Sequence, residues 1–222
     1  IRDSICAIEW RSKINSQKWR DNWDWAHTVS TWLPSILWGA AFANLVQGMK
    51  IEVVEVATGN VIPAENVPSE TLLAGASHEL TGGFFSLLTP FTILGGLVTC
   101  SLFLTHGALY TALKTAGDLS ARAEAFARKS AIASTALTAV WALWAQLAYS
   151  LNALAWIPLL VAAVFLIASL LMTWAGRQGW AFSLHFGGIA FAVVFIFSAM
   201  APNVMRSSID DSYSLSLIHI SE

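Results

Sequence analysis

Two histidines, His106 and His185, lie deep in long apolar stretches of this 222-residue chain, and an imidazole is a side chain that could do chemistry. Either imidazole could ligate a haem iron or relay protons. Neither has a second ligand at a convincing spacing, so we expect each to be a neutral histidine hydrogen-bonded to a neighbouring helix. We assign no catalytic, cofactor-binding or metal-binding residue from the sequence.

The two cysteines predict no metal chemistry. Cys6 lies in a polar N-terminal segment and Cys100 in an uncharged stretch, which makes a disulfide between them improbable. The sequence has no CxxC, no CxxCH and no paired Cys/His spacing. These spacings are typical of zinc, iron–sulfur and c-type haem sites, so we expect none of them on this chain.

Uncharged polar residues allow two interpretations. Asn44 and Gln47 could contact a quinone head group or a lipid, but we favour a helix-capping role. Small residues recur at four-residue intervals, which lets helix backbones approach closely and indicates helix packing. These small residues are Ser130, Ser134 and Thr138, then Gly96 and Cys100, then Gly188 and Ala192.

The distribution of charge shows which elements must hold these residues. All 26 charged residues are excluded from four stretches, residues 25–49, 80–113, 130–176 and 178–205, which together hold 134 of the 222 residues. A water-soluble fold places charge on every surface helix, whereas a bilayer core about 30 Å thick takes about 20 apolar residues for each helical crossing. The sequence therefore predicts an all-α, multi-pass transmembrane helical bundle.

Span lengths set the number of crossings at five. The 47-residue stretch 130–176 would make a single helix about 70 Å long, so we predict a hairpin that turns at residues 151–153. Pro158 then falls in the first turn of the returning helix, where its missing N–H costs least. Residues 1–29 are predicted to be a juxtamembrane segment, 30–201 the bundle, 114–129 a solvated helical connector and 202–222 an external segment. The predicted spans are about 31–48, 84–113, 130–150, 154–174 and 180–201.

Basic residues predict the orientation of the bundle. With five spans, ten Lys and Arg side chains fall on one side of the membrane, and only Lys50 and Arg206 fall on the other. The positive-inside rule then places the N-terminal end of the chain in the cytoplasm. Tryptophans also gather at the predicted inner boundary. The net charge of −2 gives no indication of a nucleic-acid partner.

The predicted spans contain no Asp, Glu, Lys or Arg, which argues against the conducting centre of a pump or transporter. A fragment of a secondary transporter and a non-catalytic membrane assembly subunit remain alternative interpretations. Because the chain begins at Ile1 and shows no signal-peptide pattern, we expect a fragment of a longer protein.

Several strings resemble subunit II of the cytochrome bd-type quinol oxidases, in that family's order and across the chain to about residue 215. They are WRSKI (10–14), WRDNWDWA (19–26), FANLVQG (42–48), GGFFSLLTPF (82–91), THGALYTALKTAGDL (105–119) and SSIDDSYSL (207–215). Any one string alone would be weak, and the combination is specific.

The resemblance implies a terminal oxidase of the prokaryotic plasma membrane that oxidises quinol and reduces dioxygen to water. It implies that haem b and haem d are carried by a partner, subunit I, and that this chain packs against subunit I as a helical bundle. The implied partners are subunit I, membrane lipid and the quinone pool.

The chain also departs from the pattern of the family. The N-terminal helices, with their proton-delivery residues, and the final span have no counterpart here, so no proton-path residue can be assigned. Arg206 replaces a usual proline before Ser207. Residues 216–222 (SLIHISE) do not continue the family pattern and resemble translated adaptor sequence, so we give His219 no functional role.

Overall fold

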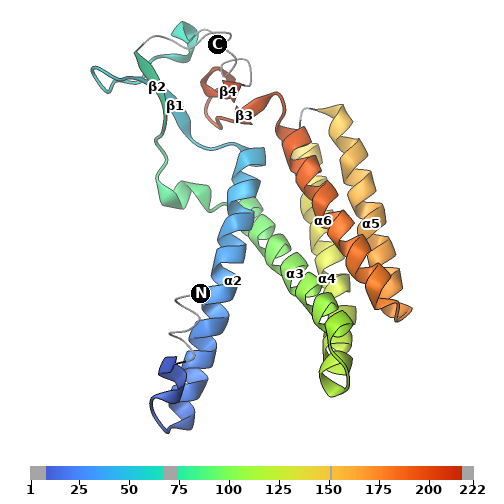
Figure 1. The fold of residues 1–222 in the computed structure, drawn as a ribbon. Helices are drawn as coiled ribbons and strands as arrows, with labels where there is room; N and C mark the ends of the chain where they lie inside the picture. Colours follow the sequence, from blue (N-terminus) through green and yellow to red (C-terminus); the bar gives the residue numbers. More distant parts are fainter. Residues whose placement is uncertain (1–8, 68–74, 151, 217–222) are drawn as a thin grey trace.

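Five long helices form the computed structural model of the chain, which describes residues 9–67, 75–150 and 152–216. Each of the five is long and apolar enough to cross a membrane, and this confirms the predicted all-α multi-pass bundle (Figure 1). Cys6, Glu70, Leu151 and His219 lie outside the described residues. The helices are α2 (Gln17–Gln47), α3 (Pro90–Lys114), α4 (Asp118–Ala148), α5 (Trp156–Trp174) and α6 (Gln178–Met200).

Two helices extend beyond the predicted spans at the same end of the molecule. Helix α2 begins at Gln17 rather than near residue 31, and α4 joins the expected connector to the third span as one 31-residue helix. Neither extension contains a glycine or proline that would interrupt the helix, so backbone hydrogen bonding continues past the apolar stretch. The expected juxtamembrane segment and connector are therefore partly rigid extensions of the spans.

Helix α3 begins later than predicted, at Pro90 rather than at Phe84. The Thr89 hydroxyl accepts from the Thr92 backbone N–H, and the Thr92 hydroxyl accepts from the Thr89 N–H. This reciprocal cap, with proline at the first helical position, fixes the start of the helix. Residues 84–87 form a short 3-10 turn before it.

The predicted hairpin within residues 130–176 is present. Helix α4 ends at Ala148, and α5 returns from Trp156 with Pro158 in its first turn. Asn152 holds the turn: its side-chain oxygen accepts from the Leu154 N–H, and its amide donates to the Ser198 carbonyl of α6.

The segments at the other end form an ordered cap, which the sequence analysis did not anticipate. Strand β1 (Ile51–Glu55) pairs antiparallel with β2 (Ala76–Leu80), and β3 (Asn203–Met205) pairs with β4 (Leu215–Ser216). The Ser207 hydroxyl donates to the Ile51 carbonyl, which joins the two sheets although they are distant in sequence. Both sheets lie at the end of the bundle where α2 stops and α3 starts (Figure 1).

Acidic side chains are concentrated on this cap. Glu52, Glu55 and Glu79 lie on its strands, and Asp210 and Asp211 lie in the turn between β3 and β4. The Ser212 hydroxyl and backbone N–H both donate to Asp210 and hold the pKa of that carboxyl below its usual value. This cap is therefore the acidic end of the molecule.

The helices pack through small residues, as predicted. A Cβ built on Gly96 would lie 2.6 Å from the Ile36 carbonyl of α2, and one on Gly188 would lie 2.7 Å from Leu166 of α5. Hydroxyl groups add contacts between helices: Thr105 of α3 donates to Ser134 of α4. The core gathers around Phe91, Trp141 and Phe195. Trp141 is buried, whereas Trp144 is 40% exposed.

Candidate functional site: an apolar cavity and a histidine pair

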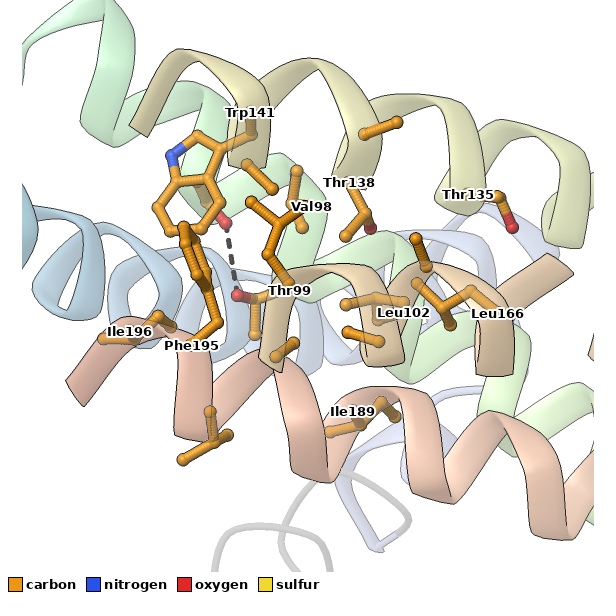
Figure 2. Close-up of a pocket in the computed structure, with 18 of the residues that line it drawn as sticks. Val98, Thr99, Leu102, Thr135, Thr138, Trp141, Leu166, Ile189, Phe195 and Ile196 are labelled. Atoms are coloured by element: carbon orange, nitrogen blue, oxygen red, sulfur yellow. Dashed lines mark hydrogen bonds between the residues drawn. The ribbon is translucent and has the colours of Figure 1, made fainter. Parts of the chain in front are cut away.

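Residues from all five helices line a cavity of about 430 Å³. Figure 2 shows Val98, Leu102 and Phe195 among its walls. Two of its threonines are already satisfied, because Thr99 donates to the Gly95 carbonyl and Thr138 to the Ser134 carbonyl. The walls are otherwise apolar except for the indole N–H groups of tryptophans, of which that of Trp141 is buried without a hydrogen-bond partner among the described residues. None of the residues that line it is a histidine, cysteine or methionine.

The two histidines singled out in the sequence lie together between α3 and α6. Their ring centroids are 5.4 Å apart, and the rings are inclined by only 23°. Phe182 stacks on His106 with centroids 4.4 Å apart. His185 is only 2% exposed and His106 is half-buried. The sequence predicted that both lie inside spans but not that they form a pair.

The expected hydrogen bonds from these histidines to neighbouring helices are absent. Nδ1 of His106 and both ring nitrogens of His185 are buried without a hydrogen-bond partner among the described residues. The prediction of a satisfied core histidine is therefore wrong at these atoms. Sequence position fixes the depth of a residue along a helix, but the partners available to it depend on how the helices rotate against each other.

A signal for the pairing was nevertheless present in the sequence. His106 precedes the end of α3 by eight residues, and His185 follows the start of α6 by seven. At 1.5 Å per residue, each lies roughly 11 Å from the same end of the bundle. Equal depth on two antiparallel helices is a necessary condition for contact.

The pair does not fit a haem. Axial imidazoles point a ring nitrogen at the iron from opposite sides of a flat macrocycle, which then separates the two rings. Here the faces of His106 and His185 are turned toward each other, and Phe182 already covers His106. The cavity does not fit one either, because its walls lack the side chains that ligate iron. Within the described residues, no group of three or more His, Cys, Asp or Glu is placed to hold a metal ion.

Asn44 and Gln47 join segments at the cap end of the bundle rather than capping their own helix. The Asn44 amide donates to the carbonyls of Ala40 and Leu87, so it ties α2 to the segment before α3. The Gln47 oxygen accepts from the Thr89 hydroxyl, and its amide donates to the Tyr149 hydroxyl after α4. The predicted helix-capping role is therefore wrong for both side chains, which instead link α2 to neighbouring segments.

We expect Asn44→Leu to lower the free energy of unfolding by about 0.5–1.5 kcal/mol, because it removes the hydrogen bond from α2 to the Leu87 carbonyl, which keeps only the Thr92 hydroxyl as a side-chain donor. Ser35→Ala on the same helix is the matched control, since the Ser35 hydroxyl bonds only the Thr31 carbonyl of its own helix. It should change stability by less than about 0.5 kcal/mol. Thermal unfolding of the full-length protein in detergent measures both. Equal stability of the two variants would contradict the network.

Geometry thus defines a class: a multi-pass helical membrane protein with an apolar interior, a histidine pair between two spans and an acidic cap at one end. The family model described as cytochrome bd terminal oxidase subunit II matches residues 4–220. The chain belongs to this family, which confirms the resemblance found in its motifs.

Individual relatives agree with the family. The chain is 32% identical over 141 residues to the cytochrome bd-I ubiquinol oxidase subunit 2 of Escherichia coli (strain K12), a match that covers 62% of this chain and 32% of that protein. It is 29% identical over 222 residues to the cytochrome bd ubiquinol oxidase subunit 2 of Bacillus subtilis (strain 168), covering 97% of this chain and 58% of that protein. A probable cytochrome oxidase subunit 2 of Haemophilus influenzae is 30% identical over 138 residues, covering 61% of this chain and 32% of that protein. The matches thus span between a third and three fifths of the length of these relatives.

Proposed function

We propose that the protein containing this chain is subunit II of a quinol:oxygen oxidoreductase, a terminal oxidase that couples quinol oxidation to the reduction of dioxygen to water in aerobic respiration. The observation that carries the proposal is the family match over residues 4–220, on a chain that folds as five apolar spans. Two of the relatives are named ubiquinol oxidase subunits.

In this proposal, subunit I carries haem b and haem d and forms a heterodimer with this subunit, and quinol is the substrate of the complex. The support on this chain is geometric. The histidine pair presents ring faces rather than converging nitrogens, and the walls of the cavity are apolar apart from threonine hydroxyls and tryptophan indole N–H groups. The residues of this chain pack the spans, keep water from the interior and offer exposed apolar side chains, such as Phe186 and Trp38, to lipid or to a partner helix.

The proposed location is the plasma membrane of a prokaryote, with the N-terminal end of the chain in the cytoplasm. The N-terminal half of α2, the α3–α4 turn and the α5–α6 turn lie at one end of the bundle (Figure 1). Nine basic residues of the described part lie there: Arg11, Lys13, Lys18, Arg20, Lys114, Arg122, Arg128, Lys129 and Arg177. The acidic cap lies at the other end, with Lys50 and Arg206 as its basic residues in the described part. Such an asymmetry favours the basic end inside the cell.

The proposal is tested by deleting the full-length gene while subunit I is retained, and then complementing it. We expect membranes without the subunit to lose quinol-dependent oxygen consumption to background, and complementation to restore it. Oxygen uptake with a reduced quinol measures this loss. Preserved activity would contradict the proposal and favour a non-catalytic assembly role.

The assignment of the haems to subunit I is tested by a separate measurement. The full-length subunit purified alone should show no haem absorbance, and the absorbance should appear when subunit I is purified with it. Stoichiometric haem on the isolated subunit, lost in His106→Ala or His185→Ala, would contradict the assignment of the haems to subunit I.

A further inference from the structure

Unsatisfied nitrogen atoms mark the space between α3 and α6. A neutral imidazole carries one N–H donor and one acceptor nitrogen. His185 has both nitrogens buried and unpartnered, and His106 has one. Each buried polar group without a partner costs about 1–3 kcal/mol. One N–H···N hydrogen bond between the two rings would satisfy two of these three atoms, one on each ring.

The distance between the two ring centroids fits a hydrogen bond between the imidazoles. When two imidazoles share an N–H···N hydrogen bond of about 2.9 Å, their centroids lie about 5 Å apart, because each nitrogen is about 1 Å from its ring centre. The observed separation is 5.4 Å. The χ2 torsion of histidine has a broad range of allowed values, and rotation of a ring about this torsion leaves its centroid almost in place. A turn of both rings out of their stacked arrangement, in which His106 also leaves the face of Phe182, would bring a nitrogen of each ring toward the other.

The surroundings allow the pair to hold one positive charge and oppose a second. The charged side chains of α3, α4 and the α5–α6 turn are Lys114, Asp118, Arg122, Glu124, Arg128, Lys129 and Arg177, and Cys100 and Tyr110 are further titratable groups of α3. Of the two carboxylates in this set, Glu124 is already engaged, since it accepts from Arg128 and from Gln178. The other faces are aromatic: Phe182 stacks on His106, and Phe186 lies 6.4 Å from it. Aromatic faces attract a cation, whereas two cations 5.4 Å apart repel strongly in an apolar medium.

We propose that His106 and His185 form one proton-binding site, in which a single proton is shared as an N–H···N hydrogen bond between the two imidazoles and a second proton is excluded. The proton comes from the aqueous phase at the basic end and forms an N–H bond to one ring, while the facing nitrogen of the other ring accepts it. The pair passes from neutral to a charge of plus one. Half-buried His106 is the point of entry, and His185 is the sealed member.

Nitrogen NMR of ¹⁵N-histidine-labelled full-length protein in lipid bilayers tests the site without reference to oxidase activity. We expect a coupling between one nitrogen of His106 and one of His185, and uptake of one proton by the pair as the pH is lowered. Exposed His27 on α2 is the internal reference, and its nitrogens should show no such coupling. Because the measurement is made on the wild-type protein, its result does not depend on the folding of any variant.

Two variants complete the test. His185→Phe keeps an aromatic ring but removes the shared nitrogen, so the coupling should vanish and His106 should titrate as a single group. Phe186→Leu alters a neighbouring ring and should leave the coupling in place. Independent double protonation of both wild-type histidines would overturn the proposal, and so would two rings that remain unprotonated and uncoupled throughout the titration.

Discussion

Gly96→Ala and Gly39→Ala should each destabilise the bundle, although alanine is the better helix former. A Cβ on Gly39 would lie 2.6 Å from the Gly95 carbonyl, and one on Gly96 would lie 2.6 Å from the Ile36 carbonyl. Both contacts are with backbone, which cannot rotate away, so α2 and α3 must move apart. Overpacking of this kind costs about 1–3 kcal/mol. We expect a net loss despite a gain of up to about 1 kcal/mol in helix propensity.

Gly107→Ala is the matched control, because it makes the same substitution on α3 where a Cβ meets no atom within 4 Å. It should leave stability unchanged or raise it by up to about 1 kcal/mol. The sign of the effect therefore separates close packing from helix propensity. Thermal unfolding of the full-length protein in detergent measures all three variants. If Gly96→Ala unfolds at the same temperature as Gly107→Ala, the two helices do not depend on this close approach.

Larger residues should have a larger effect, because α2 has few other contacts with the bundle. Its buried residues all lie between Gly39 and Val46, next to the crossing with α3. From there α2 diverges from the other helices (Figure 1). We expect Gly39→Leu combined with Gly96→Leu to give no folded protein at all, as judged by size-exclusion chromatography, whereas Gly107→Leu should elute as the wild type does.

The fold was predictable because the exclusion of charge is a property of composition, independent of tertiary contacts. Every uncharged stretch contains at least one long helix of the structure. The stretch 130–176 contains two helices joined as a hairpin, as its length alone had predicted. Helix ends were less predictable. Helices α2 and α4 begin at Gln17 and Asp118, outside the apolar stretches. A helix can continue from the membrane into water, where charged side chains are not buried, so the charge pattern does not mark where the helix ends.

The cap and the histidine pair were not predictable for a different reason. The hydrogen bond from Ser207 to Ile51 joins residues 156 positions apart, and no local pattern encodes such a contact. The contact between His106 and His185 likewise depends on the rotation of α3 and α6 about their axes. The prediction that each histidine is hydrogen-bonded rested on what buried histidines do in most proteins, and the unpartnered nitrogens of this pair differ from that average.

Cysteine labelling should show an all-or-none difference between the two ends of the bundle. In full-length protein whose native cysteines have been replaced, Glu65→Cys should react with a membrane-impermeant maleimide added to intact cells. Ala121→Cys should react only after the membrane is opened. Both positions are exposed, so accessibility within the protein does not limit either reaction. The physical reason is the charge asymmetry, because translocating the basic end is disfavoured.

The opposite labelling pattern would reverse the bundle and would also change the meaning of the histidine pair. His106 and His185 lie roughly 11 Å from the basic end, near the turns between α3 and α4 and between α5 and α6. With that end in the cytoplasm, the pair exchanges protons with the interior of the cell. With the acidic cap in the cytoplasm, the same pair would exchange them with the outside. Labelling at residues 65 and 121 therefore decides which side of the membrane the proton site serves, independently of whether NMR detects the shared proton.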